Sequence, residues 1–313
     1  MHLFTIVISI LLPIALGILF RFLGFSLDEA ASLRKFVIRV TVPFIVFRNL
    51  FNANLESLSQ IAPSVLAMFL LTLLFAVSSL LMSRILPRGQ ALRNAFVFST
   101  FVGNYGYLGW GVMYHFYGDT GFTRSVFFTL FFWPIFLLVG FGLIYFLNKE
   151  ENVSGKEIVR ILLKNSAPPL ISAAAGLGLN LLSFSFPPLI SDFISQFASM
   201  TIPLILFTIG LSFHFTMKKS SLATVLLSCF HRLILGYILG WAVCCLVSLF
   251  FPLDPVTRKV ILLESIMPTA AMAPFFAEHI TVDKKLQASI VTLSTALSLL
   301  TIPLWYLITE ALF

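Results

Sequence analysis

Apolar residues fill ten long runs of this sequence, and charged or turn-forming residues separate one run from the next. Each run is close to the roughly 20 residues that an α-helix needs to cross a bilayer, and none shows the alternation of a membrane β-strand. The pattern predicts an all-α membrane protein with ten transmembrane helices. They are expected at residues 3–22, 33–51, 61–82, 92–117, 121–147, 158–182, 188–213, 222–250, 258–279 and 287–309.

Composition excludes several other classes of protein. Of the 313 residues, 59% are hydrophobic and 11% are charged, whereas a soluble domain carries about 25% charged residues. The net charge of +7 is not gathered into a basic run, so a nucleic-acid-binding domain is not expected. The three cysteines, Cys229, Cys244 and Cys245, share one apolar run without CxxC spacing, which argues against a disulfide framework and a metal site.

The distribution of Lys and Arg predicts the orientation of the helices. If the N-terminus lies outside, 16 of the 20 basic residues, Arg232 among them, fall in or beside cytoplasmic loops, as the positive-inside rule requires. The exceptions are Arg48, Arg124, Arg258 and Lys259. We therefore expect a multi-pass integral membrane protein with both termini outside, in a bacterial inner membrane.

Two halves of the sequence resemble each other. A Thr-x-Pro motif with apolar neighbours occurs at Thr41–Pro43 and again 160 residues later at Thr201–Pro203. Repeats of 1–147 and 158–313, joined by a cytoplasmic linker at 148–157, would each hold five helices. Because five is odd, the second half must enter the membrane in the opposite sense. The sequence predicts a 5+5 inverted repeat.

The fourth and ninth runs each carry a helix-breaking stretch at equivalent places. Gly103 and Gly106 interrupt one run, and Pro268 and Pro274 interrupt the other. Glycine permits open backbone angles, proline removes a helical hydrogen bond, and each freed backbone group needs a partner in lipid. Paired broken helices in inverted halves indicate a transporter binding site, where we expect them to cross near mid-membrane. Further breaks are expected at Pro43 and Pro203.

Three segments together resemble the auxin efflux carrier family over essentially the whole chain. They are the motif around Pro43, Gly103–Gly109 followed by Tyr117–Asp119, and Met267–Ala271. The resemblance implies the fold of the bile acid sodium symporters and an elevator-like movement. The first, second, sixth and seventh helices would form a scaffold, and the third to fifth and eighth to tenth a transport domain. Many family members have Asn where Met272 stands, so neither auxin nor sodium coupling is assumed.

Polar residues near the breaks are the candidate binding residues. The amide of Asn104 offers donors and an acceptor to a carboxylate, or it ties down the broken backbone of the ninth helix. Tyr105 and Tyr107 either line the substrate cavity or only pack against other helices. Thr269 donates its hydroxyl to substrate or bonds back to its own helix. Met272 completes the expected substrate site.

Glu264 is the only acidic residue well inside an apolar run. An ionisable group in the membrane is costly and by default suggests a function. A carboxyl that loads and unloads a proton would couple transport to the proton gradient. The alternatives are a structural partner for a basic residue or for backbone, and a residue at headgroup level.

These features favour a secondary transporter that moves a small organic anion, a carboxylate or auxin-like molecule, as a uniporter or with protons. A sodium-coupled symporter of the same fold and an intramembrane enzyme are the alternatives. The sequence has no Walker motif and no catalytic Ser-His or paired Asp setting, so no enzyme activity, catalytic residue, cofactor or metal is expected. Its expected partners are the lipid bilayer, the anion and protons, and a homodimer is left open.

Overall fold

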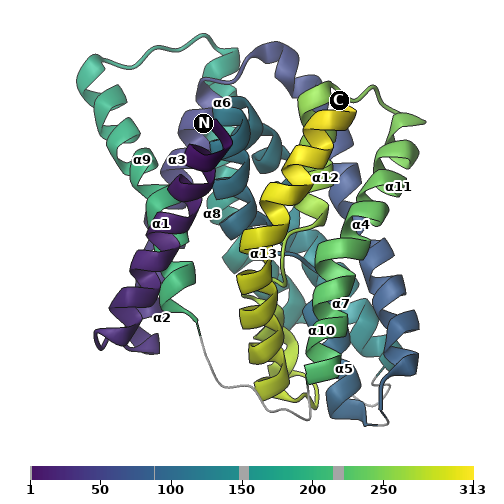
Figure 1. Ribbon diagram of the computed structural model, residues 1–313. Coiled ribbons are helices and arrows are strands. Elements are labelled where there is room, and N and C mark those ends of the chain that lie inside the picture. Colours follow the sequence, from purple (N-terminus) through teal and green to yellow (C-terminus); the bar gives the residue numbers. More distant parts are fainter. Residues whose placement is uncertain (1, 88, 148–154, 214–221) are drawn as a thin grey trace.

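The computed structural model describes residues 2–87, 89–147, 155–213 and 222–313, which are almost entirely helical (Figure 1). The expected linker falls largely outside these residues. The first half contains α1 (His2–Phe22), α2 (Leu27–Phe36), η1 (Val37–Thr41), α3 (Val42–Phe51), η2 (Leu55–Gln60), α4 (Ile61–Met82), η3 (Ser83–Ile85), α5 (Gln90–Thr100), η4 (Tyr105–Gly109), α6 (Trp110–Thr129) and α7 (Phe132–Leu147). The second half contains α8 (Gly155–Leu181), α9 (Pro188–Leu211), α10 (Leu222–Phe230), η6 (His231–Leu235), α11 (Gly236–Ser248), α12 (Pro255–Ser265), η7 (Ala273–Glu278) and α13 (Lys284–Leu312).

Four uninterrupted helical stretches are long and apolar enough to cross a membrane by length and composition. They are Leu58–Ile85, Pro188–Leu211, Leu222–Ser248 and Lys284–Leu312. The bent pair Tyr105–Thr129 and Phe132–Leu147, with 41° between its parts, would make a fifth. Each of the ten predicted runs contains helix, but ten spans are not confirmed, because several runs are interrupted or short within the described residues.

The second predicted helix begins earlier than its apolar run. The Ser26 hydroxyl accepts a hydrogen bond from the Glu29 amide (3.1 Å), and the Glu29 carboxylate accepts one from the Ser26 amide (2.7 Å). This capping box satisfies two amides that a helix start otherwise leaves free. The helix therefore starts at Leu27 rather than at residue 33.

Two expected helix breaks are wrong. Pro43 follows the π-helical turn η1, which joins α2 to α3, so the helix continues through this position. Pro203 lies inside α9, which continues to Leu211. The boundary expected between the fourth and fifth helices is a kink within α6 at Gly118, whose φ of 63° favours glycine.

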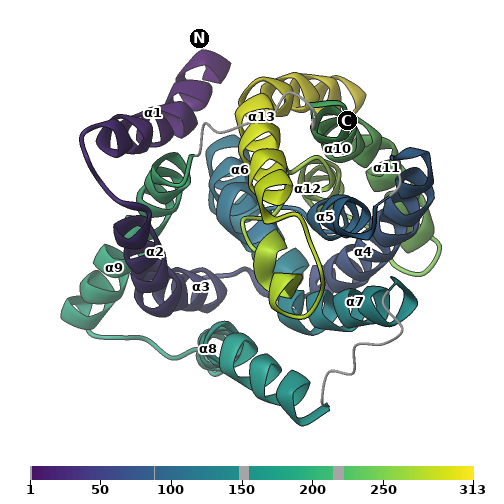
Figure 2. The same cartoon turned by 90° about the horizontal axis from the view of Figure 1, so that it is seen from below.

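The helices form two groups when the molecule is seen along the bundle (Figure 2). In one group, α9 packs against α1 and α3, and α3 also packs against α8. In the other, α4 packs against α6 and α11, α11 against α12, and α10 against α13. Both termini lie at one end, called here the terminal end, and α2 lies at the other, called the α2 end (Figure 1).

Candidate substrate site

The interruptions of the two broken helices meet inside the protein. Gly103, just after α5, forms an isolated antiparallel bridge with Thr269, which follows α12. Next to this bridge the Asn104 amide N–H donates to the Pro268 carbonyl oxygen at 2.8 Å. Each interruption thus supplies partners for backbone groups that the other leaves free, as a low-dielectric interior requires.

Arg232 holds the two interruptions together. This fully buried side chain donates from Nε (3.1 Å) and Nη2 (2.8 Å) to the Met267 carbonyl oxygen, and from Nη1 to that of Thr100 (3.5 Å). Its guanidinium stacks 3.8 Å from the ring centroid of Phe75. A Cβ atom at Gly103 would collide with the guanidinium, so glycine is needed at this point of the motif.

The cytoplasmic position expected for Arg232 is wrong. Carbonyl oxygens of both interruptions attract its side chain into the core, so it does not contribute to the charge of a loop. Its place on η6, well inside the apolar run 222–250, is the sequence signal that could have identified it, since ionisable residues within such runs are generally functional.

Glu264 is also fully buried, close to the same interruptions. Its Oε1 accepts a hydrogen bond from the Ser125 hydroxyl on α6, and its Oε2 has no hydrogen-bond partner among the described residues. A Cβ atom at Gly109 would collide with this carboxylate. Glu264 does not line either of the two cavities described next.

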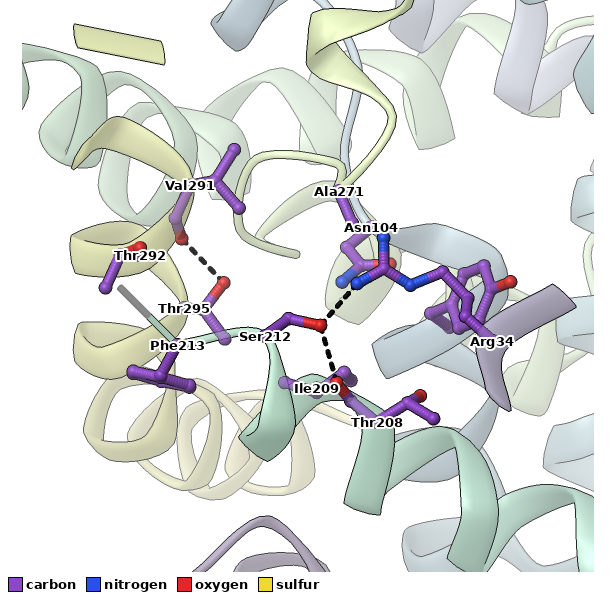
Figure 3. A pocket seen from close by; sticks show the side chains of 11 residues that line it. Arg34, Asn104, Thr208, Ile209, Ser212, Phe213, Ala271, Val291, Thr292 and Thr295 are labelled. Carbon is purple, nitrogen blue, oxygen red and sulfur yellow. Dashed lines mark hydrogen bonds between the residues drawn. The ribbon is translucent and has the colours of Figure 1, made fainter. Parts of the chain in front are cut away.

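A cavity that we call the polar cavity, after the polar side chains in its wall, lies beside the interruptions toward the α2 end (Figure 3). Its empty space of about 410 Å³ includes space open to solvent. Arg34 on α2 donates to the Ser212 hydroxyl, which in turn donates to the Thr208 carbonyl oxygen at 2.7 Å. The cavity combines one cation with hydroxyl and amide groups. It is lined by Arg34, Asn104, Tyr107, Thr208, Ile209, Ser212, Phe213, Ala271, Val291, Thr292 and Thr295.

An aromatic cavity of about 820 Å³ adjoins the polar cavity. The two share Asn104, Tyr107 and Ala271 in their walls. Apolar and aromatic side chains with few convergent polar groups are typical of sites for small organic molecules. The aromatic cavity is lined by Ile38, Val42, Gly103, Asn104, Tyr105, Gly106, Tyr107, Trp110, Thr129, Leu130, Phe132, Trp133, Ile205, Ala270, Ala271 and Met272.

Asn104 stands where the two cavities meet. The residue is 5% exposed, and no described group forms a hydrogen bond with its side-chain amide. The broken backbone after α12 is held by the Asn104 backbone N–H rather than by the amide. The side chain therefore retains two donors and an acceptor for a molecule in either cavity.

The sequence profile of a family described as "membrane transport protein" matches residues 2–306. This chain belongs to that family, the auxin efflux carriers. It is 26% identical over 306 residues to an uncharacterised transporter of Methanothermobacter thermautotrophicus, and 25% identical over 308 residues to one of Methanocaldococcus jannaschii. Each match covers 96% of both chains. Both relatives are archaeal and give no support to a bacterial membrane.

In this member of the auxin efflux carrier family, some of the other predicted site residues line a cavity and some do not. Tyr105, Tyr107 and Met272 line the aromatic cavity, and so does Gly106 at the start of the helical segment that resumes the broken helix. Thr269 lines neither cavity: its amide donates to the Ser294 hydroxyl at 3.2 Å. Pro274 lies in the first turn of the short helix η7.

Proposed function

We propose that this protein is a secondary transporter that moves a small organic anion across the membrane by an elevator-like movement. Family membership supports transport, and the unpartnered Asn104 amide between two cavities carries the assignment of the substrate site. The amide has no partner among the described residues, so a polar molecule in either cavity can use its two donors and its acceptor. The large aromatic cavity suits an apolar substrate body.

The proposed architecture is a ten-span 5+5 inverted repeat of residues 1–147 and 158–313, whose broken helices cross near mid-membrane. The group of α1–α3, α8 and α9 would be the scaffold, and α4–α7 with α10–α13 the moving transport domain. Most helix–helix contacts lie within one group or the other, which supports this division, while α7 and α6 also contact helices of the scaffold group. Termini at one end agree with an even number of spans, and we propose that this end faces outward.

Purified protein in liposomes tests the proposed function. A thermal-shift screen of carboxylates at several pH values selects candidates, and uptake of the stabilising compounds is then measured with and without imposed gradients. We expect saturable uptake of at least one organic anion that is lost in Asn104→Ala. Product formation without uptake would support the enzyme alternative, and uptake dependent on a sodium gradient the symporter alternative.

Coupling to protons is proposed to use Glu264. We expect Glu264→Gln to retain substrate exchange but to lose acceleration by a pH gradient, because glutamine resembles a permanently neutral carboxyl. Ser125→Ala is the matched control, since it removes the hydrogen bond to Glu264 while leaving the carboxyl able to titrate. If Glu264→Gln responds to the gradient as the wild type does, Glu264 is not the coupling residue. If the wild type ignores the gradient, the protein is a uniporter.

A further inference from the structure

Arg34 is a cation whose charge no described acidic group balances. No described carboxylate lies within 4 Å of it, and its one hydrogen-bond partner in this part of the chain is the uncharged Ser212 hydroxyl. The residue is half-buried in the wall of the polar cavity. A guanidinium has five N–H donors, so most of those on Arg34 are unused. A partly desolvated cation in this condition favours an anion beside it.

The free donors of Arg34 share the polar cavity with the free amide of Asn104. Figure 3 shows the Arg34 guanidinium reaching from α2 toward the region between Ser212 and Asn104. The hydroxyl-bearing Thr292 and Thr295 come from α13 on the other wall. A planar guanidinium binds carboxylate-like oxyanions through two parallel hydrogen bonds, which an ammonium group cannot imitate.

We propose that Arg34 is an anion-binding residue of the polar cavity, which holds the oxyanion of a ligand together with the Asn104 amide. The ligand's apolar body then extends past Asn104 and Tyr107 into the aromatic cavity, because both residues belong to both walls. This inference rests on the proposed function for two claims: that the bound anion is the transported one, and that the two groups of helices move past each other.

The position of Arg34 makes its contact with the anion dependent on the state of the transporter. Arg34 lies on α2, which packs against α9, whereas Asn104 belongs to the interruption that Arg232 ties to α12 and η6. Movement of one group of helices past the other therefore separates the two anion-binding side chains. Arg34 acts on the anion in the state with the polar cavity open, at the α2 end, and not from the terminal end.

Thiol modification at Ala271 tests this proposal without knowledge of the substrate. Ala271 lines both cavities, so Ala271→Cys, in a background with Cys229, Cys244 and Cys245 replaced by alanine, reports the local charge. The rates of a sulfonate-bearing and a trimethylammonium-bearing methanethiosulfonate reagent are compared in proteoliposomes. We expect the anionic reagent to be favoured from the α2 end, and Arg34→Gln to lower the ratio of rates about tenfold, as for loss of one nearby charge.

Matched variants separate the charge of Arg34 from the shape of the cavity. Arg34→Lys keeps the charge and should keep the ratio, as should Ser212→Ala, which removes the hydrogen-bond partner only. Arg48→Gln, at the other end of the molecule, should leave the ratio unchanged. Each variant must elute as a monodisperse peak. If Arg34→Gln does not elute in this way, Arg34→Lys tests the proposal instead. This variant must keep the ratio of reagent rates and must bind anions more weakly than the wild type.

The outcomes for Arg34 and for the proposed function are distinguishable. A reagent ratio that is the same in wild type and Arg34→Gln overturns the anion-binding role, even if carboxylates are transported. An Arg34-dependent ratio in a protein that transports no organic anion overturns the proposed function and leaves the anion site in place. Equal dependence on Arg34 from both faces overturns the restriction to one state.

Discussion

The polar cavity has a counterpart at the terminal end of the molecule, a pocket of about 690 Å³ that we call the α3–α6 pocket. It is lined by Arg48, Asn49, Asn52, Ala53, Asn54, Asp119, Thr120, Thr123 and Arg124. Four of these residues lie five, six, nine and ten positions after Pro43, namely Arg48, Asn49, Asn52 and Ala53. The polar cavity takes residues at the same four distances after Pro203, namely Thr208, Ile209, Ser212 and Phe213.

A second set of residues has the same internal spacing in both hollows, at a different offset along the chain. Asp119, Thr120 and Thr123 line the α3–α6 pocket. Their partners in the polar cavity, each 172 residues later, are Val291, Thr292 and Thr295. Helical periodicity explains the spacing within each set, but not the equal distances of the first set from Pro43 and Pro203. The agreement of the first set supports the proposed repeat, although the two hollows differ in volume.

Their charges are not equivalent. At the terminal end Arg48 lies 3.8 Å from Asp119, and Arg124 lies 2.8 Å from Asp254. In the polar cavity Arg34 has no such partner among the described residues. The comparison teaches that residues at the same distances from two prolines line both hollows, whereas single side chains make one hollow suited to an anion.

The largest expected effect concerns the ion pair that distinguishes the terminal end. Asp254 pairs with Arg124, which is almost fully buried, and caps α12 by accepting from the Thr257 amide at 2.7 Å. Asp254→Ala should lower the free energy of unfolding by about 3 kcal/mol, through loss of the cap and of the ion pair with a buried arginine. Chemical unfolding in detergent measures this loss. Asp119→Ala, in an exposed pair, should cost less than about 1 kcal/mol, and equal losses would contradict the comparison.

Asn104→Ala tests whether ligand binding belongs to one hollow alone. A buried hydrogen bond to a charged group contributes about 1.5–3 kcal/mol, so affinity for a transported anion should fall roughly ten- to hundredfold. Equilibrium binding to the purified protein measures this change. Asn52→Ala, in the α3–α6 pocket, is the control and should leave affinity unchanged. Wild-type affinity in a monodisperse Asn104→Ala protein would remove Asn104 from the site.

A smaller change should make the two hollows alike. Asp119→Asn leaves Arg48 without its acidic partner, as Arg34 is in the polar cavity. Because the pair is exposed, stability should change by less than about 1 kcal/mol. With Asn52→Cys as reporter, the preference for an anionic thiol reagent should rise by a few-fold at low salt and vanish at about 1 M salt. No rise at low salt would show that the pair does not control the local potential.

The smallest effect is expected at the capping box that begins the helix carrying Arg34. Hydrogen bonds from the Ser26 amide and hydroxyl lower the pKa of Glu29 below its ordinary value. A lowered pKa stabilises the folded helix start at neutral pH, and this contribution is lost as the pH falls through the folded-state pKa. Hydrogen exchange of the amides at 27–30, corrected for its intrinsic pH dependence, should lose protection in acid, and Glu29→Gln should remove this pH dependence.

Hydropathy predicted the helices well because long apolar runs have few alternatives in lipid. The local geometry at the ends of the helices was harder to predict from the sequence. The capping box at Ser26 adds six residues before the apolar run, and the π turn before Pro43 keeps a helix where proline indicates a break. Such features depend on hydrogen bonds between particular atoms rather than on average polarity.

The site was predicted in part for the same reason. Glycine and proline located both interruptions, and Asn104 with Tyr105 and Tyr107 lies in the cavities there. Arg34 and Arg232 were counted as topology signals, because counting charges near the ends of runs does not show which way a side chain points. Thr269 pairs with Gly103 beside the aromatic cavity but does not line it, and its hydroxyl is buried without a hydrogen-bond partner among the described residues.

The clamp made by Arg232 also bears on how the chain is assembled during synthesis. The Thr100 carbonyl and the Asn104 amide find their partners in residues at positions 232 and 268, far along the chain. At about 5–20 residues per second, those partners emerge roughly 10–30 s after the first interruption has been made. During that interval the nascent first half must keep its open backbone hydrated or shielded by the insertion machinery, because lipid offers no substitute. The first half can therefore be released into lipid only after the second half has been synthesised.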